Sequence, residues 1–469
     1  MHKPKSAAEG KPWIIELESF SFTYPGDDSL SDNGMSLQIK EGETVLLLGP
    51  SGSGKSTLAL GLCGLIPHAV AGKMSGVVRI AGLDTRETEP GELARVVGTV
   101  FQYPDAQTVM MTVEDEIAFG LENIGVPRVE MEKRIREALK TVGLTVQGNQ
   151  PVDQLSGGQK QRLTLSSVLA MEPDVLVLDE PTANLDPAGT AEVFHTLRRL
   201  KASGHYTIVL IEHKLDDLVD LVDRVIVIDK NGELVCSGAP ESIFYDWAAE
   251  LESLGVWFPQ AVEIARKLQL AGVPIESKVL SMKQLAEALR GFEHSPRVGG
   301  EWNDAQEKSP DTSELDVTST ALHSHSSPPL LDIRPVGPPG RSAGWLRPIE
   351  LQVRRGEFWA IVGENGAGKT TLARHIIGLL PVRPGVIFID GNDAAVYPVY
   401  ELARRIGFVF QNPEHQFVTE RVWDEIAFSL KGMGLPEEEI STRVNHLLER
   451  FGLKGYADAH PFCLSHGQK

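Results

Sequence analysis

The sequence has no stretch of about eighteen consecutive apolar residues, which is the length that a membrane-spanning helix requires. It has only three cysteines, Cys63, Cys236 and Cys463, and none of them forms a C-x-x-C pair. Neither a disulfide framework nor a zinc site is therefore indicated. We expect a protein of the reducing cytoplasm that reaches a membrane only through a partner.

Dense clusters of lysine and arginine are also missing. The chain holds 45 Lys and Arg residues against 64 Asp and Glu residues, for a formal net charge of −19. Binding to DNA or RNA needs basic clusters that neutralise phosphates, so the composition disfavours a nucleic-acid partner. The 469 residues, of which 42% are hydrophobic and 23% charged, are ordinary globular material for two or three domains.

What the sequence does contain is an internal repeat. The segment ETVLLLGPSGSGKSTLALGLCGLIP aligns with EFWAIVGENGAGKTTLARHIIGLLP, and FQYPDAQTVMMTVEDEIAFGL aligns with FQNPEHQFVTERVWDEIAFSL. Between the copies, residues 293–329 are rich in Ser, Pro and acidic residues and indicate a solvated linker. We therefore predict a first copy over residues 11–240, a helical extension over 241–292 and a second copy over 330–469.

Each copy has a glycine-rich loop between an apolar run and an amphipathic segment. In the first copy the run Thr44–Leu48 predicts a buried parallel strand and a helix is predicted from Ser56, which indicates an α/β fold. Glycines let the N–H groups of the connecting loop surround a phosphate at the positive end of the helix. Lys55 would reach the β and γ phosphates of a nucleotide, and the Ser56 hydroxyl would hold Mg²⁺. The predicted nucleotide-binding residues of these P-loops are Gly49, Gly52, Ser53, Gly54, Lys55, Ser56 and Thr57 in the first copy, and Gly363, Gly366, Ala367, Gly368, Lys369, Thr370 and Thr371 in the second.

Two further apolar runs of the first copy end in polar residues. DVLVLDE ends in two carboxylates, so a buried strand would deliver Asp179 to Mg²⁺ and Glu180 to an attacking water. The alternative is a solvated strand end followed by a turn. TIVLIEH ends in His213, which taken alone would more often be a structural histidine.

Taken in order, LSGGQKQR, VLVLDEPTANLD and IVLIEHK resemble the signature, Walker B, D-loop and switch-histidine motifs of the ATP-binding cassette (ABC) ATPases. The resemblance implies ATP and Mg²⁺ as ligands and catalytic roles for Glu180, His213 and Gln102. In this family the histidine touches the γ-phosphate, and the glutamine senses Mg²⁺ and the transmembrane partner. The resemblance also places Asp186 in the D-loop and Tyr24 on the adenine ring, although a core aromatic in an edge strand is the open alternative for Tyr24.

Cassettes of this family work as head-to-tail pairs, in which the signature motif of one cassette caps the γ-phosphate held by the other. The resemblance therefore implies two composite sites formed by pairing within the chain. Site one would combine the first P-loop, Gln102, Asp179, Glu180 and His213 with the second signature motif, and site two would combine Lys369, Thr370 and Gln411 with the first signature motif. The implied signature residues are Ser156, Gly157, Gly158 and Gln159, then Ser465, Gly467 and Gln468, and the implied metal-site residues are Ser56, Asp179, Gln102, Thr370 and Gln411.

The second copy departs from the family pattern. Its signature reads LSHGQ, with His466 where the family has glycine, so we expect site one to be slower. Pro338 aligns with Tyr24, so no aromatic residue for adenine is evident at site two. The strand FWAIVG is expected, but no Walker B strand, D-loop or switch histidine comes before Lys469. We expect an incomplete second P-loop domain that is unstable on its own, as in a truncated two-cassette sequence.

The segments FQYPDAQ and FQNPEHQ, each followed by DEIAF, resemble the ATPases of energy-coupling factor (ECF) transporters, which import vitamins and metal ions. In that family a helical region after the cassette serves dimerisation. Here Val262, Ala265, Leu268 and Ala271 share one predicted helical face and Ser281 caps a second helix, but packing against the chain's own cassette is the alternative. The resemblance implies a transmembrane coupling subunit and a substrate-binding membrane subunit as partners, at the cytoplasmic face of the membrane. Fusion of two cassettes resembles the ECF arrangement for thiamine precursors.

A rival class is the ABC-F proteins, which carry two cassettes in one chain and act on the ribosome. Their partner is RNA, so basic surfaces and a long charged helical linker are expected. This chain is acidic and its linker is rich in Ser and Pro, so the transporter interpretation is favoured.

Overall fold

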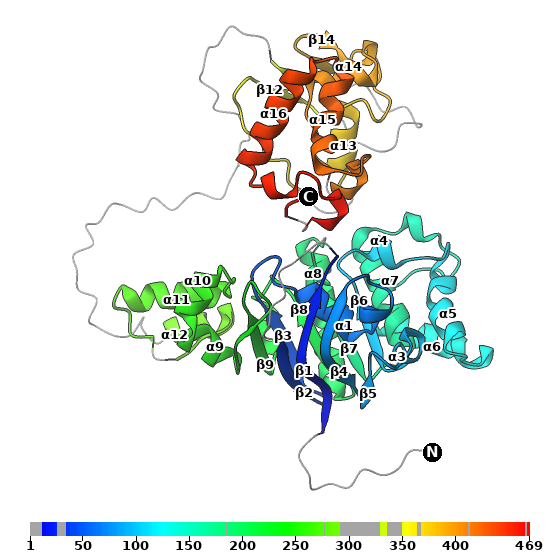
Figure 1. Cartoon of the computed structure of the whole chain (residues 1–469), viewed down its shortest axis with the longest axis vertical. Coiled ribbons are helices and arrows are strands. Elements are labelled where there is room, and N and C mark those ends of the chain that lie inside the picture. Colours follow the sequence, from blue (N-terminus) through cyan, green and yellow to red (C-terminus); the bar gives the residue numbers. More distant parts are fainter. Residues whose placement is uncertain are drawn as a thin grey trace. The chain divides into compact units, whose positions relative to one another are not determined.

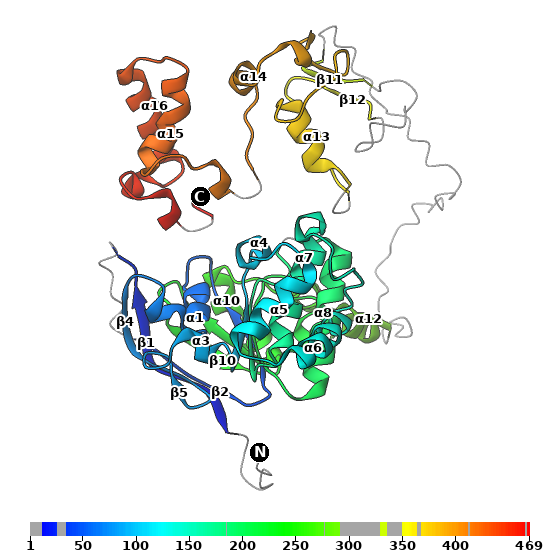
Figure 2. The ribbon, with the colours of Figure 1, turned by 90° about the vertical axis from the view of Figure 1, so that its right-hand side faces the viewer.

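The structure is a computed structural model, and it describes residues 12–25, 34–183, 185–275, 277–290, 329–334, 349–363, 367–410, 413–464 and 467–469. The chain divides into two compact units, Met1–Val298 and Gly299–Lys469 (Figures 1 and 2). The predicted linker falls almost wholly outside the described residues. Within these ranges no helix is long and apolar enough to cross a membrane.

The first unit is built on a six-stranded sheet with the strand order β10-β9-β3-β8-β7-β6. All neighbours in it run parallel except β10, which is antiparallel to β9. The central strands β3, β7 and β8 are buried at every position, which confirms the strands predicted from the apolar runs. The strands of this sheet are β3 (Thr44–Leu48), β6 (Val97–Val100), β7 (Val175–Asp179), β8 (Thr207–Ile211), β9 (Arg224–Ile228) and β10 (Leu234–Gly238).

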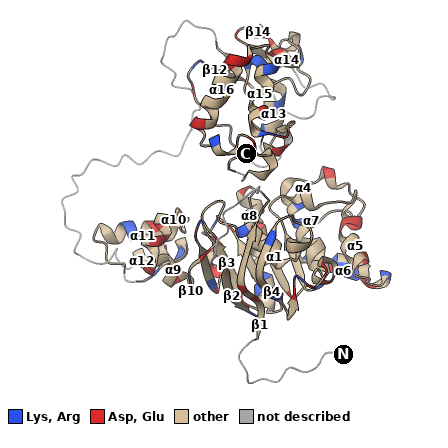
Figure 3. Ribbon diagram, viewed as in Figure 1, with Lys and Arg blue, Asp and Glu red and all other residues tan. Residues whose placement is uncertain are grey.

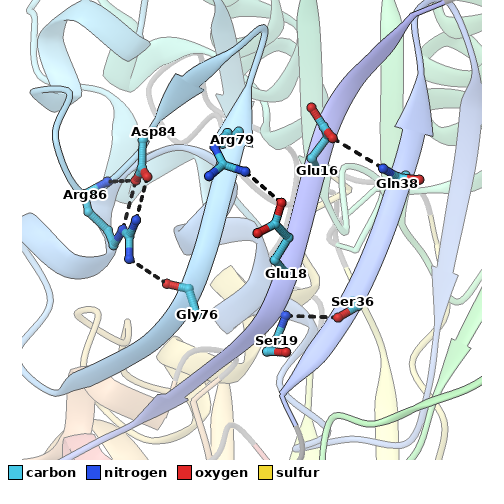
Figure 4. A network of polar contacts seen from close by, with 9 residues as sticks. All are labelled: Glu16, Glu18, Ser19, Ser36, Gln38, Gly76, Arg79, Asp84 and Arg86. Atoms are coloured by element: carbon cyan, nitrogen blue, oxygen red, sulfur yellow. Dashed lines mark hydrogen bonds and ion pairs between the residues drawn. The ribbon is translucent and has the colours of Figure 1, made fainter.

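A second sheet of four antiparallel strands, in the order β2-β1-β4-β5, packs against one face of the first. Strand β2 alternates buried and exposed residues, as expected for a sheet with one face in water. On the outer face the Arg79 guanidinium of β4 pairs with the Glu18 carboxylate of β1 at 2.8 Å (Figure 4). Arg86 pairs with Asp84 at the end of β5 at 2.7 Å and also donates to the Gly76 carbonyl oxygen of β4 at 3.1 Å. The strands are β1 (Trp13–Thr23), β2 (Met35–Lys40), β4 (Lys73–Ile80) and β5 (Leu83–Asp84).

Alternate residues of the central sheet enter two different cores. Val45 and Leu47 of β3 pack with β1 and the helix after the glycine-rich loop, whereas Leu46 and Leu48 pack with the helices on the other face. This alternation gives a three-layer α/β arrangement, in agreement with the predicted fold class. The helices are α1 (Lys55–Leu62), α2 (Leu65–His68), α3 (Pro90–Leu93), α4 (Pro104–Gln107), α5 (Val113–Asn123), α6 (Arg128–Thr141), α7 (Gly157–Ala170) and α8 (Pro187–Ser203).

Residues 240–290 form the predicted helical extension, as α9 (Pro240–Asp246), α10 (Ala248–Leu254), α11 (Gln260–Leu270) and α12 (Met282–Arg290). Phe244 and Leu251 join the main core of the first unit, so α9 and α10 pack on their own cassette. Ala265 and Leu285 belong to a separate small core between α11 and α12. The Gln284 N–H donates to the Ser281 hydroxyl at 3.4 Å, in agreement with the predicted cap.

The second unit has a four-stranded antiparallel sheet, β12-β11-β13-β14, and two small cores. Lys and Arg are interspersed with Asp and Glu in both units (Figure 3). The strands and α-helices of the second unit are β11 (Leu331–Ile333), β12 (Leu351–Val353), β13 (Ile387–Ile389), β14 (Asn392–Asp393), α13 (Lys369–Ile376), α14 (Val399–Arg405), α15 (Val422–Gly432) and α16 (Glu437–Arg450).

The strand predicted at FWAIVG is not formed. Residues 358–363 have no regular structure, and Phe358 and Val362 are 98% and 87% exposed. The prediction is wrong for a physical reason: the corresponding strand β3 is held between β8 and β9, and the described part of the second unit contains no counterpart of either strand. A strand that is buried on both faces needs its neighbours for its backbone hydrogen bonds.

Candidate active site

The loop between β3 and α1 has a backbone that only glycine adopts easily. Gly52 and Gly54 have φ values of +78° and +87°, in the left-handed region, and Gly54 is the N-cap of α1. A Cβ atom on Gly49 would lie 2.7 Å from the Ile228 carbonyl oxygen, so this position also excludes a side chain. The loop therefore brings backbone N–H groups to the positive end of a helix, the arrangement that binds phosphate.

Two side chains make this loop fit a phosphate group. Lys55 Nζ donates to the carbonyl oxygens of Gly49 and Pro50 at 2.9 and 2.8 Å, and its burial lowers the pKa of the ammonium despite the nearby charges of Glu180 and Asp179. The hydroxyl of Ser53 is buried and has no hydrogen-bond partner within the described part of the chain. A buried polar atom without a partner is costly, and a phosphate oxygen is a suitable partner for a hydroxyl.

Two carboxylates follow one another at the end of β7. Asp179 is the last residue of the strand, and burial raises the pKa of its carboxyl group, against the effect of a hydrogen bond from Ser56. This contact joins the first residue after Lys55 to the Walker-type strand. A hydroxyl and a carboxylate side by side, beside a phosphate-binding loop, are the oxygen donors that Mg²⁺ prefers.

Glu180 lies between two polar side chains from different elements. Gln102 Nε2 donates to Glu180 Oε2 at 2.6 Å, and His213 Nε2 lies 3.3 Å from Glu180 Oε1. The pKa of the Glu180 carboxyl is lowered, mainly by the hydrogen bond from His213. The carboxylate is therefore ionised at neutral pH and oriented by two neighbours, as a group that polarises a water molecule must be.

Tyr24 follows β1 and lines a cleft with a volume of about 450 Å³. Its ring is 42% exposed and meets Phe22 edge to face at 4.9 Å, and its hydroxyl lies 3.1 Å from Thr57 Oγ1. The exposure argues against a core role. The cleft is also lined by the P-loop glycines and by the turn from Lys230 to Glu233, which the sequence analysis did not predict.

The signature and D-loop residues lie at helix N-termini. Ser156 caps α7 through a reciprocal pair of hydrogen bonds with Gln159, at 3.3 and 2.9 Å. Gly157 and Gly158 form the first turn of that helix. Asp186 caps α8 by accepting a hydrogen bond from the Gly189 N–H at 2.8 Å. The structure thus brings Lys55, Gln102, Asp179, Glu180 and His213 together. Ser156 instead hydrogen-bonds Gln159 at the start of its own helix.

Comparison with known proteins identifies this arrangement. The family described as "ABC transporter" matches residues 33–183 and 346–469, which together are more than half of the chain. The chain belongs to the ABC transporter ATP-binding family. It is therefore an ABC-type ATPase with two cassettes, and ATP is its nucleotide.

Relatives of this ABC ATPase match nearly its full length. An ABC transporter ATP-binding protein of Methanosarcina acetivorans is 39% identical over 97% of this chain and 73% of its own length. YkoD of Bacillus subtilis, whose name assigns it to HMP/thiamine import, is 36% identical over 97% of this chain and 78% of its own. Among solved structures, cbiO1 from Clostridium perfringens, described as part of the ABC transporter complex cbiONQ, is 32% identical with a TM-score of 0.45, and the match covers 50% of this chain and 92% of that one.

The second ABC cassette repeats part of the P-loop geometry. Lys369 begins α13 after Gly368, whose φ is +94°, and Lys369 Nζ donates to the Gly363 carbonyl oxygen at 2.7 Å. Ala367, Thr370 and Thr371 belong to the same turn and helix start, and Gly467 and Gln468 lie near the end of the chain. The predicted residues Gly366, Gln411 and Ser465 lie outside the described residues, as do His466 and Pro338.

A buried glutamate that the sequence did not reveal as a structural contact fixes the segment after Gln102. Glu116 in DEIAF is buried and accepts hydrogen bonds from the N–H groups of Val109 and Met110 at 3.0 and 2.7 Å. Glu425 of the second cassette accepts from Val418 and Thr419 at 3.0 and 2.8 Å in the same way. The signal in the sequence was the repeated DEIAF itself, at the same distance from the loop in both copies.

Proposed function

We propose that the first cassette hydrolyses ATP with Glu180 as the group that polarises the attacking water. The observation that carries this assignment is the ionised Glu180 carboxylate held between Gln102 and His213. In this proposal Lys55 and His213 would face the γ-phosphate, and Ser56, Asp179 and Gln102 would hold Mg²⁺. When bound, the metal neutralises charge on the phosphates.

We further propose that the two cassettes complete each other's sites. Ser156 and Gly158 start a 14-residue helix, and a γ-phosphate at that N-terminus would be capped by backbone N–H groups. Ser465 and Gly467 would do the same for the first P-loop. ATP binding would then close the pair, and hydrolysis would let it open.

The proposed task of this ATPase is to power a membrane importer of the ECF type, peripheral to the cytoplasmic face, with a vitamin, a vitamin precursor or a metal ion as cargo. The name of YkoD and the paired FQYPDAQ and FQNPEHQ segments support this proposal. So does the surface after Gln102. Glu116 holds that loop while Val109 and Met111 are 61% and 80% exposed, which suits the apolar face of a short helix from a membrane subunit.

Uptake in cells tests this proposal. A strain lacking the gene should lose uptake of labelled thiamine or its pyrimidine precursor HMP, and the wild-type gene should restore it. Gln102→Ala should fail to restore uptake although its product still binds ATP, because Gln102 links the site to the partner. Unchanged thiamine and HMP uptake would contradict the vitamin cargo, and labelled cobalt or nickel uptake is the next measurement. Co-sedimentation of the chain with ribosomes instead of membranes would contradict the transporter class.

A further inference from the structure

The residues on either side of His213 hold the turn that follows Glu180. Strands β7 and β8 are parallel neighbours, with Asp179 opposite Ile211, so the turns after them lie side by side. The Glu180 N–H donates to the Ile211 carbonyl oxygen at 2.8 Å, and the φ of Glu180 is +47°, a left-handed value that is rare for a residue with a side chain. Such a conformation persists only where the surroundings enforce it.

Glu212 provides one of these contacts. Its side chain is 3% exposed, and it accepts a hydrogen bond from the hydroxyl of Thr182, which is fully buried. The same carboxylate accepts from the His213 N–H at 3.2 Å. Glu212 therefore joins the second residue after Glu180 to the backbone of the switch histidine.

Lys214, the residue that follows His213 in the sequence, provides the other contact. Its ammonium donates to the carbonyl oxygens of Thr182 and Leu185 at 2.9 and 3.2 Å, and to the Thr190 hydroxyl at 3.3 Å. These three acceptors span the start of the D-loop, the residue before Asp186 and the first turns of α8. One ammonium thus ties together three points of the chain between Thr182 and Thr190.

We propose that Glu212 and Lys214 are positioning residues for ATP hydrolysis, which hold the turn from Thr182 to Leu185 and thereby keep Glu180 within reach of His213. This flanking pair acts through the turn and touches no substrate. The inference rests on the roles of Glu180 and His213 in the proposed function. A misplacement of a catalytic group by about 1 Å lowers turnover by roughly 100-fold, so the contacts that set this distance matter for rate.

Hydrogen exchange of the full chain without nucleotide tests the pair directly. Lys214→Met keeps the length of the side chain and removes its donors, so amides of the turn should exchange at least about tenfold faster, above all Ala183 and Leu185, whose N–H groups bond within the turn. Lys201→Met is the matched control, because Lys201 also donates to a carbonyl oxygen, that of Leu221, at 2.8 Å. The control should leave exchange in the turn unchanged.

Steady-state hydrolysis by the full chain gives the second readout. Lys214→Met should lower kcat by at least about tenfold while KM and the Kd of a fluorescent ATP analogue change by less than about threefold. Lys214→Arg keeps donors at this position and should recover most of kcat. If Lys214→Met matches wild type in exchange and kcat, or if Lys201→Met lowers kcat as far, the inference is wrong.

Thr182→Val tests the contact with Glu212 without touching either charged residue. The substitution keeps the shape of the side chain and removes the hydroxyl. Amides of the turn should therefore exchange faster and kcat should fall, as in Lys214→Met. Thr207→Val is the control and should change neither quantity. Wild-type exchange and kcat in Thr182→Val would contradict the role of Glu212. Because exchange needs no hydrolysis, failure of the Glu180 assignment, seen as normal turnover by Glu180→Gln, is distinguishable from failure of this inference.

Discussion

Replacing Glu212 by Gln should make the first cassette more stable in alkaline solution. Burial raises the pKa of the Glu212 carboxyl from its usual 4.5 to about 7, against the opposing effect of the neighbouring His213 N–H. Below pH 4.5 the group is protonated whether the chain is folded or unfolded, and it contributes no pH dependence. Between pH 4.5 and about 7 the unfolded chain releases this proton while the folded chain keeps it, so stability falls as the pH rises. Above about pH 7 both states are ionised, and stability stays at the lower level because the folded state carries a buried carboxylate.

The size of the effect follows from this pKa difference. A shift from 4.5 to about 7 corresponds to roughly 3 kcal/mol at about 1.4 kcal/mol per pH unit. For a unit of this size that is a difference in Tm of roughly 5 to 10 °C. Gln has nearly the same volume, carries no charge and can still hydrogen-bond Thr182.

Scanning calorimetry of the full chain between pH 5 and 9 measures the difference. The transition of the first unit should lie higher in Glu212→Gln than in wild type at pH 9, and the two should converge as the pH falls toward 5. Glu137→Gln is the control, since Glu137 is exposed on α6 and its ion pair with Lys133 is long, at 3.9 Å. Parallel pH profiles for wild type and Glu212→Gln would refute the reasoning.

Two further predictions concern the P-loop and the second unit. Lys55→Ala should weaken binding of a fluorescent ATP analogue by roughly ten- to hundredfold, because it removes the cation that faces the phosphates; an unchanged Kd in a titration would contradict this role. Residues 330–469 expressed alone should aggregate in analytical ultracentrifugation, because the apolar side chains at 358–363 are left uncovered. A soluble monomer with a cooperative melting transition would show that another packing covers them.

The strands and helix of the first P-loop could be predicted because local sequence determines them. A short run of β-branched residues and leucines favours a buried strand, because exposing it to water is costly. The spacing of the glycines at 49, 52 and 54 favours a phosphate-binding loop. The contacts of Asp179 with Ser56 and of Glu180 with His213 followed from strand order, since parallel strands end at one edge of the sheet.

Contacts between turns could not be predicted in the same way. The segment TIVLIEHK does not reveal that Glu212 and Lys214 hydrogen-bond residues about thirty positions earlier. These contacts depend on the register of β7 against β8. At FWAIVG, by contrast, local sequence predicted a strand that does not form. An apolar run forms a central strand only where neighbouring strands pair with it, and a motif alone does not supply them.

The steady-state rate of ATP hydrolysis by Glu180→Gln in the full chain tests the central claim most directly. The substitution keeps the volume of the side chain and an acceptor for Gln102, but it removes the charge that polarises water. We predict that turnover falls by at least about 100-fold while the Kd of a fluorescent ATP analogue stays within about threefold of wild type. Turnover within a few-fold of wild type, in a variant that binds the analogue normally, would contradict the account.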